Sequence, residues 1–231
     1  MTLQSTLILQ WRYNMTSSFY EVEDEYICEK RNRYREDFGL KERQYNYNIN
    51  TTAPVQGQES VYKHICLFSE RFVLGEKQEG LLIVGGVGCG KTHMVVSIVN
   101  YIVDYLVENG NQYTVYFSNI IELIEKLRLN ENNLFWKQWL REYDLLIIDD
   151  LGAESSNAWT RERLFEIIDY RYNMNLPIVI TTNCVPEELK EKVGDRCFDR
   201  IREMCVLVSV TAKSQRKTAT FNEEQRDSVK L

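Results

Sequence analysis

Eight consecutive residues, 85–92, have the residue types and spacing of a phosphate-binding loop. They read GGVGCGKT and fill every fixed position of the pattern G-x-x-x-x-G-K-[ST]. Such a loop wraps its backbone N–H groups around anionic oxygens at the start of a helix, and glycines allow the wrap because they lack a Cβ. Lys91 adds a point charge for the β- and γ-phosphates, and the Thr92 hydroxyl is a ligand for Mg²⁺. The residues expected to bind a nucleoside triphosphate are Gly85, Gly86, Val87, Gly88, Cys89, Gly90, Lys91 and Thr92.

Two carboxylates end the apolar run 145–148. Asp149 and Asp150 stand where a buried parallel strand is expected to stop. This is the Walker B arrangement, in which one acid holds the magnesium shell and the next positions or activates water. We assign Asp149 to the metal and Asp150 to the water, with Glu154 as a competing candidate for the water.

A polar residue also ends the next apolar run. Residues 177–181 read PIVIT and continue to Asn183. The carboxyl ends of parallel strands form the ligand crevice of a doubly wound sheet, so Asn183 is placed to orient the attacking water. The alternative is an Asx turn before Pro186.

The elements that must position these residues follow from the hydrophobic periodicity. Short apolar runs alternate with stretches of helical spacing, which predicts an α/β fold with a central five-stranded parallel sheet flanked by helices. The expected strands are 81–84, 113–117, 145–148, 177–181 and 205–210, and the expected helices are 60–72, 91–108, 120–129 and 158–173.

Length and charge limit the possible functions. The chain has 231 residues, enough for one α/β domain plus an arm, and its net charge is −6. Residues 1–54 contain 8 of the 34 acidic and 7 of the 28 basic residues. The rest of the chain therefore contains 26 acidic and 21 basic residues. No general basic surface for nucleic acid is expected, so any DNA contact must be a local patch.

Cysteine usage and the N-terminus indicate the compartment. The six cysteines contain no C-x-x-C pair, which is typical of reduced, intracellular thiols without a structural zinc. No apolar run reaches membrane length, and the first eleven residues lack the regions of a signal peptide. We expect a cytoplasmic protein that does not enter a membrane, and Met15 is an alternative start.

Two segments keep two interpretations each. Residues 21–41 have charges near helical spacing and form either a solvated linker helix or a docking arm for a partner. Residues 195–202 read DRCFDRIR, with three arginines that form either a solvated face or a group reaching a neighbour's γ-phosphate.

Together these motifs resemble one family. The loop 85–92 is followed by LLIIDDLGAE at 145–154, PIVITTN at 177–183, DRCFDRI at 195–201 and SQRK at 214–217. This order is similar to that of the AAA+ ATPases of the DnaC/DnaI/IstB group, which comprises bacterial and phage loaders of replicative helicases and transposition-helper relatives. The resemblance covers residues 60–217.

The resemblance implies roles for further residues. Asn183 would be sensor 1, and Arg216 would be the sensor 2 arginine. Arg200 would be the arginine finger, which acts in trans on the nucleotide of a neighbouring copy, and Arg196 would be a second trans-acting residue. It also implies an AAA+ ATPase domain over 55–217 without a C-terminal helical lid. Residues 1–54 would be an arm or docking region, and residues 218–231 a mobile tail.

The resemblance further implies an activity and partners. The expected protein is an ATPase with Mg²⁺ that self-associates through a shared ATP site and loads a hexameric replicative helicase onto single-stranded DNA. Lys126 and Arg128, on the helix after the second strand, are the expected DNA contacts. Two alternatives stay open: an IstB-like transposition helper that binds duplex DNA, and a nucleotide-gated helicase adaptor or inhibitor with little hydrolysis.

The chain departs from the family at two places. Many DnaI-like loaders have a cysteine zinc site near the N-terminus, whereas only Cys28 is present in that region here, so zinc is not expected. The second Walker B acid, Asp150, is one methylene shorter than the usual glutamate, so we expect slow, partner-stimulated turnover.

Overall fold

The computed structural model of the protein describes residues 25–49, 54–110, 113–130 and 143–215. Its centre is a five-stranded sheet in the order β2-β3-β4-β1-β5, in which all neighbouring strands are parallel. The strands are β1 (Gly80–Gly85), β2 (Val115–Asn119), β3 (Leu145–Asp149), β4 (Ile178–Thr182) and β5 (Cys205–Val210). The predicted α/β class with a central five-stranded parallel sheet is therefore confirmed.

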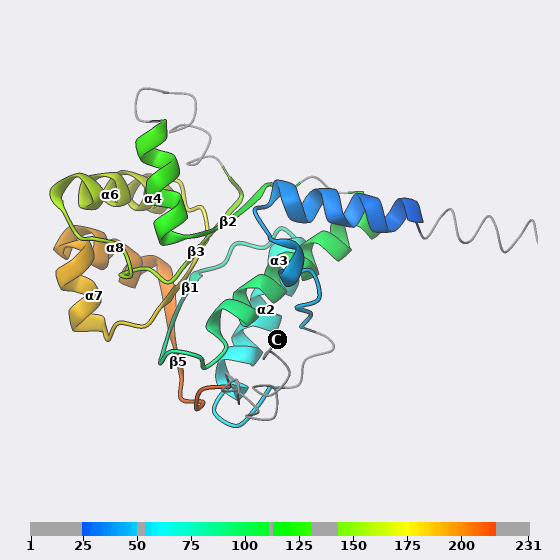
Figure 1. Ribbon diagram of the computed structural model, residues 1–231, viewed down its shortest axis with the longest axis horizontal. Helices are drawn as coiled ribbons and strands as arrows, with labels where there is room; N and C mark the ends of the chain where they lie inside the picture. Colours follow the sequence, from blue (N-terminus) through cyan, green and yellow to red (C-terminus); the bar gives the residue numbers. More distant parts are fainter. Residues whose placement is uncertain (1–24, 50–53, 111–112, 131–142, 216–231) are drawn as a thin grey trace, which may run out of the picture.

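Helices cover both faces of this sheet (Figure 1). They are α2 (Glu59–Val73), α3 (Lys91–Asn109), α4 (Ile120–Leu129), α6 (Ala158–Asn173), α7 (Pro186–Val193) and α8 (Asp195–Met204), with a 3-10 turn η1 (Glu42–Gln44) and a helical stretch over 25–37. None of the helices in the described part of the chain is both long and apolar enough to cross a membrane.

Local sequence signals set several helix ends. α3 ends where Gly110 adopts a φ of 71°, the left-handed conformation that glycine favours. α4 begins after Asn119, whose side chain accepts the N–H of Ile121 at 2.9 Å. Both ends agree with the sequence prediction. α7 was not predicted, although Pro186 in its first turn is a common helix start.

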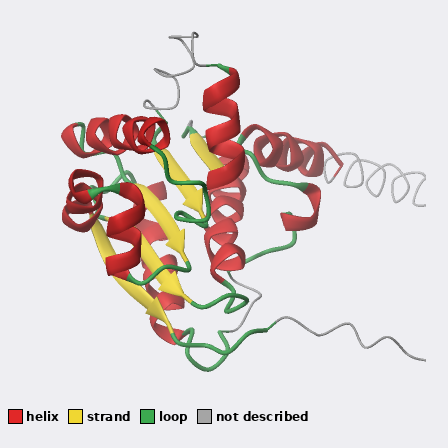
Figure 2. Cartoon of the chain, turned by 60° about the vertical axis from the view of Figure 1, so that its left-hand side comes forward, coloured by secondary structure: helices red, strands yellow, loops and turns green. Residues whose placement is uncertain are grey.

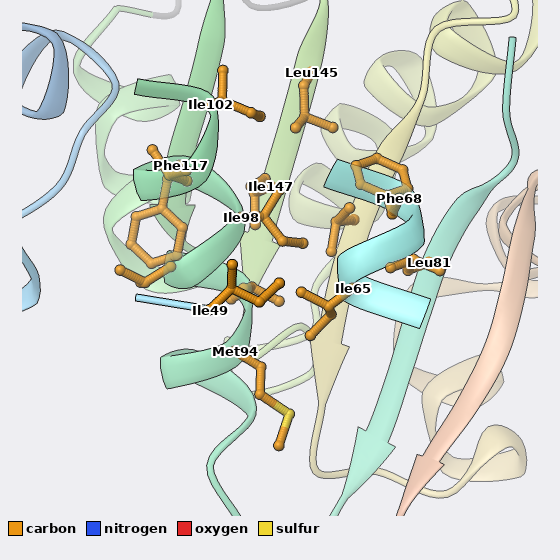
Figure 3. Close-up of a cluster of buried hydrophobic side chains, with 14 of the residues drawn as sticks. Ile49, Ile65, Phe68, Leu81, Met94, Ile98, Ile102, Phe117, Leu145 and Ile147 are labelled. Atoms are coloured by element: carbon orange, nitrogen blue, oxygen red, sulfur yellow. The ribbon is translucent and has the colours of Figure 1, made fainter. Parts of the chain in front are cut away.

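Successive residues of each strand face opposite sides of the sheet, which creates two separate cores. Ile83 packs with α2 and α3, whereas Leu82 packs with α4, α6, α7 and α8. Figure 3 shows the first core, where side chains of α2 and α3 meet those of β1 and β3. Strands that are buried on both faces read as continuous apolar runs, which is why the sequence revealed them.

The described part of the N-terminal segment packs onto this body. Phe38 and Ile49 are buried in the core formed by α2 and α3. The Phe38 carbonyl accepts the N–H of Phe117 on the edge strand β2 at 2.8 Å. At Gly39, with a φ of 89°, a Cβ would lie 2.3 Å from the Phe117 carbonyl oxygen, so glycine is required. The segment thus shares a core with the sheet, and the boundary expected after residue 54 stays a proposal.

Asn100 on α3 is a buried polar residue that holds this segment. Its Nδ2 donates to the carbonyls of Gln44 at 3.0 Å and Tyr47 at 2.7 Å, and its Oδ1 accepts from Arg35 Nε at 2.9 Å. Because all of these polar groups are paired, their burial costs little. The helical stretch 25–37 is therefore bonded to the helix that starts at the phosphate loop.

Arg171 on α6 is fully buried and bonds the chain ahead of two strands. Its guanidinium donates to the carbonyls of Tyr143 at 2.8 Å, Asp144 at 3.3 Å and Pro177 at 2.7 Å. Burial lowers the pKa of Arg171 to about 9, so the group is still charged at neutral pH. Since these carbonyls precede β3 and β4, Arg171 holds the starts of both strands.

We expect Arg171→Met to lower the free energy of unfolding by about 3 kcal/mol, because three carbonyls, one of them in a fully buried bond, would lose a charged donor. Urea unfolding followed by circular dichroism measures the loss. Lys190→Met is the matched control, since it breaks only an exposed ion pair with Asp195, worth about 0–1 kcal/mol. Equal losses in the two variants would contradict this role of Arg171.

Candidate functional site

The phosphate loop joins β1 to the first turn of α3. All strands run in the same direction (Figure 2), so β1, β3 and β4 end at one edge of the sheet. Gly90 precedes α3 with a φ of 96°, and a Cβ there would lie 2.7 Å from Gln58 Nε2. The loop opens onto a polar cavity of about 380 Å³, which is lined by Tyr47, Val87, Gly88, Gly90, Lys91, Thr92, His93, Asp150, Asn183 and Gln215.

Lys91 places a buried ammonium group at this cavity. The residue is 5% exposed, and its Nζ donates to the carbonyls of Gly85 at 2.8 Å and Gly86 at 3.0 Å and to Asn183 Oδ1 at 2.6 Å. These three acceptor oxygens are neutral. A buried cation that donates to three neutral oxygens, with Cys89 Sγ at 3.9 Å as a further acceptor, is electrostatically suited to an anionic ligand, so Lys91 fits the phosphate role predicted for it.

Thr92 and Asp149, the predicted magnesium ligands, are in direct contact. Thr92 Oγ1 donates to Asp149 Oδ2 at 2.8 Å. Burial raises the pKa of Asp149, and hydrogen bonds from Thr181 and Thr92 oppose that rise. Hydroxyl and carboxylate oxygens suit Mg²⁺. The described residues contain no cluster of three or more His, Cys, Asp or Glu able to hold a metal ion.

Asp150 and Asn183 meet beside Lys91. Asn183 Nδ2 donates to Asp150 Oδ1 at 3.0 Å, while Asn183 Oδ1 accepts from Lys91. The Asx turn considered for Asn183 is therefore wrong, because its side chain is bonded to the site instead. Asp150 has a φ of 58°, an uncommon conformation for a residue with a Cβ that recurs at functional sites.

A second, apolar cavity of about 270 Å³ adjoins the first. Gly90, His93 and Gln215 line both. The other lining residues come from the segment before α2, from α2 and from α3, and they are Ile49, Pro54, Val55, Gln58, Tyr62, Ile65, Met94 and Ser97. A polar cavity at a phosphate loop that continues into an apolar one suits a nucleotide, with charged phosphates at one end and a flat base at the other.

Gln58 is a residue of this site that the sequence reading missed. Its Nε2 donates to the carbonyl of Cys89 at 2.8 Å, and its Oε1 accepts the N–H of Val55 at 3.1 Å. It therefore bonds the phosphate loop to the segment before α2. No spacing rule relates residues 31 positions apart, so only the tertiary structure reveals the contact.

Tyr47 and His93 form one wall of the polar cavity. Their rings stack with centroids 4.2 Å apart and planes inclined by 27°. Burial lowers the pKa of the His93 imidazole. Since the Tyr47 carbonyl is also bonded to Asn100, the N-terminal segment is held against this side of the site.

The two predicted trans-acting arginines lie on α8, which contributes no residue to either cavity. Arg200 Nε donates to Asp169 Oδ1 at 3.2 Å, and its guanidinium lies 4.2 Å from the Tyr172 ring centroid. The hydrogen bond to Asp169 raises the pKa of Arg200. Arg196 is exposed. Both roles stay predictions.

Three other predicted residues also lie apart from the cavity. The Glu154 carboxylate accepts the N–H of Gly152 at 2.7 Å within its own turn. On α4, Lys126 Nζ donates to the Tyr116 hydroxyl at 3.0 Å, and Arg128 lies 5.3 Å from the Trp159 ring centroid. The proposed DNA contacts are thus exposed cations that pack on aromatic rings of their own chain.

Arg216 and the tail 218–231 lie outside the described residues, as does Met15. The residue before Arg216 is informative, however. The backbone N–H of Gln215 donates to the carbonyl of Gly88 in the phosphate loop at 2.9 Å. The chain therefore returns to the phosphate loop just before the predicted sensor 2 arginine.

We expect Lys91→Met to weaken the binding of a fluorescent ATP analogue about 100-fold, because charged hydrogen bonds of about 1.5–3 kcal/mol would be lost. Fluorescence titration measures the affinity. Lys63→Met, which removes an exposed lysine of α2, is the control and should bind as the unmodified chain does. Similar affinities for the two variants would refute the phosphate role.

His93 predicts a pH dependence of stability. Its lowered pKa means that the unfolded chain takes up the proton more readily than the folded chain below about pH 6.5. The free energy of unfolding should fall as the pH drops through that value, and His93→Phe should remove this part of the fall. Urea unfolding at about pH 7.5 and 5.5 measures it. His64→Phe, at a half-buried position on α2, is the control and should keep the part of the fall that is due to His93.

Comparison with known proteins identifies the family of this domain. Residues 58–207, more than half of the chain, match the bacterial DnaA ATPase domain. The replicative helicase loader DnaI of Bacillus subtilis is 27% identical over 135 residues, which cover 57% of this chain and 42% of DnaI. The chromosomal replication initiator DnaA of Geotalea uraniireducens is 28% identical over 167 residues, which cover 65% of this chain and 36% of that DnaA. The chain thus spans less than half the length of these relatives.

Solved structures agree with this result. The crystal structure of the DnaC helicase loader matches with a TM-score of 0.65 and 28% identity, over 74% of this chain and 99% of that one. The AMPPCP-bound DnaA from Aquifex aeolicus matches with a TM-score of 0.60 and 22% identity, over 71% of this chain and 50% of that one. This match shows that the two proteins share a fold. The chain therefore belongs to the family of the bacterial DnaA ATPase domain and is an AAA+ protein similar to the helicase loaders DnaC and DnaI.

Proposed function

We propose that this chain is an ATP-dependent loader that places a hexameric replicative helicase on single-stranded DNA. The observation that carries the proposal is the match to the DnaC helicase loader, at 28% identity over 99% of that chain. The DnaA structure is matched over only 50% of its length, at 22% identity. This difference in the matched share of each solved protein, rather than the sequence identity, favours a loader over an initiator.

Nucleotide binding is assigned to the two adjoining cavities. Lys91 would hold the phosphates, and Thr92 with Asp149 would hold Mg²⁺, which neutralises charge on the phosphate oxygens when bound. The apolar cavity beside Gln58 would take the base. This assignment follows from the buried ammonium, the hydroxyl–carboxylate pair and the continuous lining of the two cavities.

Hydrolysis is assigned to Asp150 and Asn183. Asp150 would accept a proton from the attacking water, and Asn183 would orient that water. Asn183 contacts Lys91 through one atom of its amide and Asp150 through the other. A ligand that draws Lys91 away from Asn183 would therefore also change the surroundings of Asp150, which supports a switch between two states of the chain.

Self-association is proposed to complete the site. Arg200, with Arg196 as a second candidate, would reach the nucleotide of a neighbouring copy, since α8 contributes nothing to the cavities of its own chain. Arg216 would act on the nucleotide of its own chain, because Gln215 is bonded to the phosphate loop. Lys126 and Arg128 are kept as weak, salt-sensitive contacts to DNA. Such a loader would act in the cytoplasm of a bacterial or phage-infected cell.

We expect ATP hydrolysis to rise when single-stranded DNA and a cognate hexameric helicase are added. Lys91→Ala and Arg200→Ala should each reduce the rate at least about 100-fold, the scale of losing one charge-stabilising group. A mixture of these two variants should recover part of the activity, because each copy supplies the group that the other lacks. Arg202→Ala, an exposed arginine two positions further along α8, is the control and should keep full activity.

Three outcomes separate the proposal from its alternatives. Background turnover with intact ATP binding and intact helicase binding would favour a nucleotide-gated adaptor, and Asp150→Asn would then leave biological activity unchanged. Stimulation by duplex DNA without any helicase binding would favour a transposition helper. Full loss of activity in Arg200→Ala without recovery in the mixture would argue against a shared site.

A further inference from the structure

A threonine outside the predicted site residues bonds both Walker B acids. Thr181 Oγ1 donates to Asp149 Oδ1 at 2.6 Å and accepts the backbone N–H of Asp150 at 2.9 Å. Thr181 is fully buried on β4, and Ile148, the residue before Asp149, pairs with Ile180 in the parallel register. The strand pairing thus places this hydroxyl next to the end of β3.

The two bonds determine the direction of the Thr181 hydroxyl. A hydroxyl has one proton to donate, and the Asp150 N–H can only donate, so the Thr181 proton must point to Asp149. Asp149 Oδ1 is held by Thr181 and Oδ2 by Thr92, so both carboxylate oxygens have a hydroxyl donor. Rotation of the Asp149 carboxylate would break at least one of these bonds.

The same hydroxyl also supports the unusual backbone of Asp150. This residue has a φ of 58°, a conformation that persists only where its surroundings hold it. The bond from its N–H to Thr181 and the bond from Asn183 to its carboxylate are two such restraints. One side chain on β4 therefore restrains both acids. It holds Asp149, the proposed metal ligand, by its carboxylate, and Asp150, which is proposed to position water, by its backbone N–H.

We propose that Thr181 is a positioning residue of the nucleotide site, whose buried hydroxyl holds Asp149 and Asp150 in the geometry that binds Mg²⁺ with ATP and orients water. The inference rests on the proposed function. Thr181 lines neither of the two cavities and acts through the two acids. Its removal changes the contribution of Mg²⁺ to ATP binding rather than the binding of the nucleotide itself.

Thr182 is a matched control on the same strand. It is also fully buried, and its hydroxyl makes two comparable bonds, to the Leu151 carbonyl at 2.7 Å and from the Cys184 N–H at 3.0 Å. Because neighbouring strand residues face opposite sides, neither bond involves a Walker B acid. Thr181→Val and Thr182→Val thus each remove one hydroxyl group and its two hydrogen bonds from a fully buried position.

The test is titration of the full chain with a fluorescent ATP analogue, with Mg²⁺ and with EDTA. The ratio of the two affinities is the gain that Mg²⁺ provides. We expect Thr181→Val to reduce this gain about tenfold, the size of one hydrogen bond to a charged group, and to lower kcat at saturating Mg²⁺ and ATP. Thr181→Ser, which keeps the hydroxyl, and Thr182→Val should stay within about twofold of the unmodified chain, although both valine variants should melt at a lower temperature.

The outcomes distinguish this inference from the proposed function. Equal Mg²⁺ gains for Thr181→Val and Thr182→Val would overturn the positioning role and leave the loader proposal intact. No Mg²⁺-dependent ATP binding by the unmodified chain would overturn both. Should Thr181→Val fail to fold, Thr181→Cys, with a weaker donor of similar size, should give an intermediate gain, and an unchanged gain would refute the role.

Discussion

Parallel pairing of β1, β3 and β4 is the constraint on which the site depends. The register pairs Ile83 with Thr181 and Ile148 with Ile180, so the three strands end at nearly the same level. The phosphate loop, the two acids and Asn183 each lie at or directly after one of these ends. Hydrogen bonding between backbones, which is indifferent to side-chain chemistry, therefore assembles residues from distant parts of the sequence.

The site concentrates polar groups that would be costly to bury separately. Lys91, Asp149 and Thr181 are each 5% exposed or less. Their hydrogen bonds form one continuous network. Thr181 and Thr92 bond Asp149, Thr181 also bonds Asp150, and Asn183 joins Asp150 to Lys91. Each group thus offsets the desolvation of another. A ligand that changes one of these bonds would change the surroundings of the others, which supports the proposed nucleotide-dependent switch.

The N-terminal segment links a surface helix to the same site. The helical stretch 25–37 is bonded through Arg35 to Asn100, and Asn100 holds the Tyr47 carbonyl. Tyr47 in turn stacks on His93, the residue after the phosphate loop. These contacts connect the helical stretch 25–37 to the wall of the polar cavity beside the phosphate loop.

The sequence alone predicted the five strands and most of the helices, and it singled out the residues that are proposed to form the site. A strand buried on both faces must be apolar throughout, and a phosphate loop needs glycines, a lysine and a threonine at defined spacing, so these features depend on neighbours along the chain. α7 escaped prediction because Pro186 starts a helix as readily as it follows a turn. The contacts of Gln58 with Cys89, of Asn183 with Lys91 and of Thr181 with both acids were decided only by the tertiary structure. Each joins residues on different elements, and strand order and register, rather than local sequence pattern, bring them within hydrogen-bonding distance.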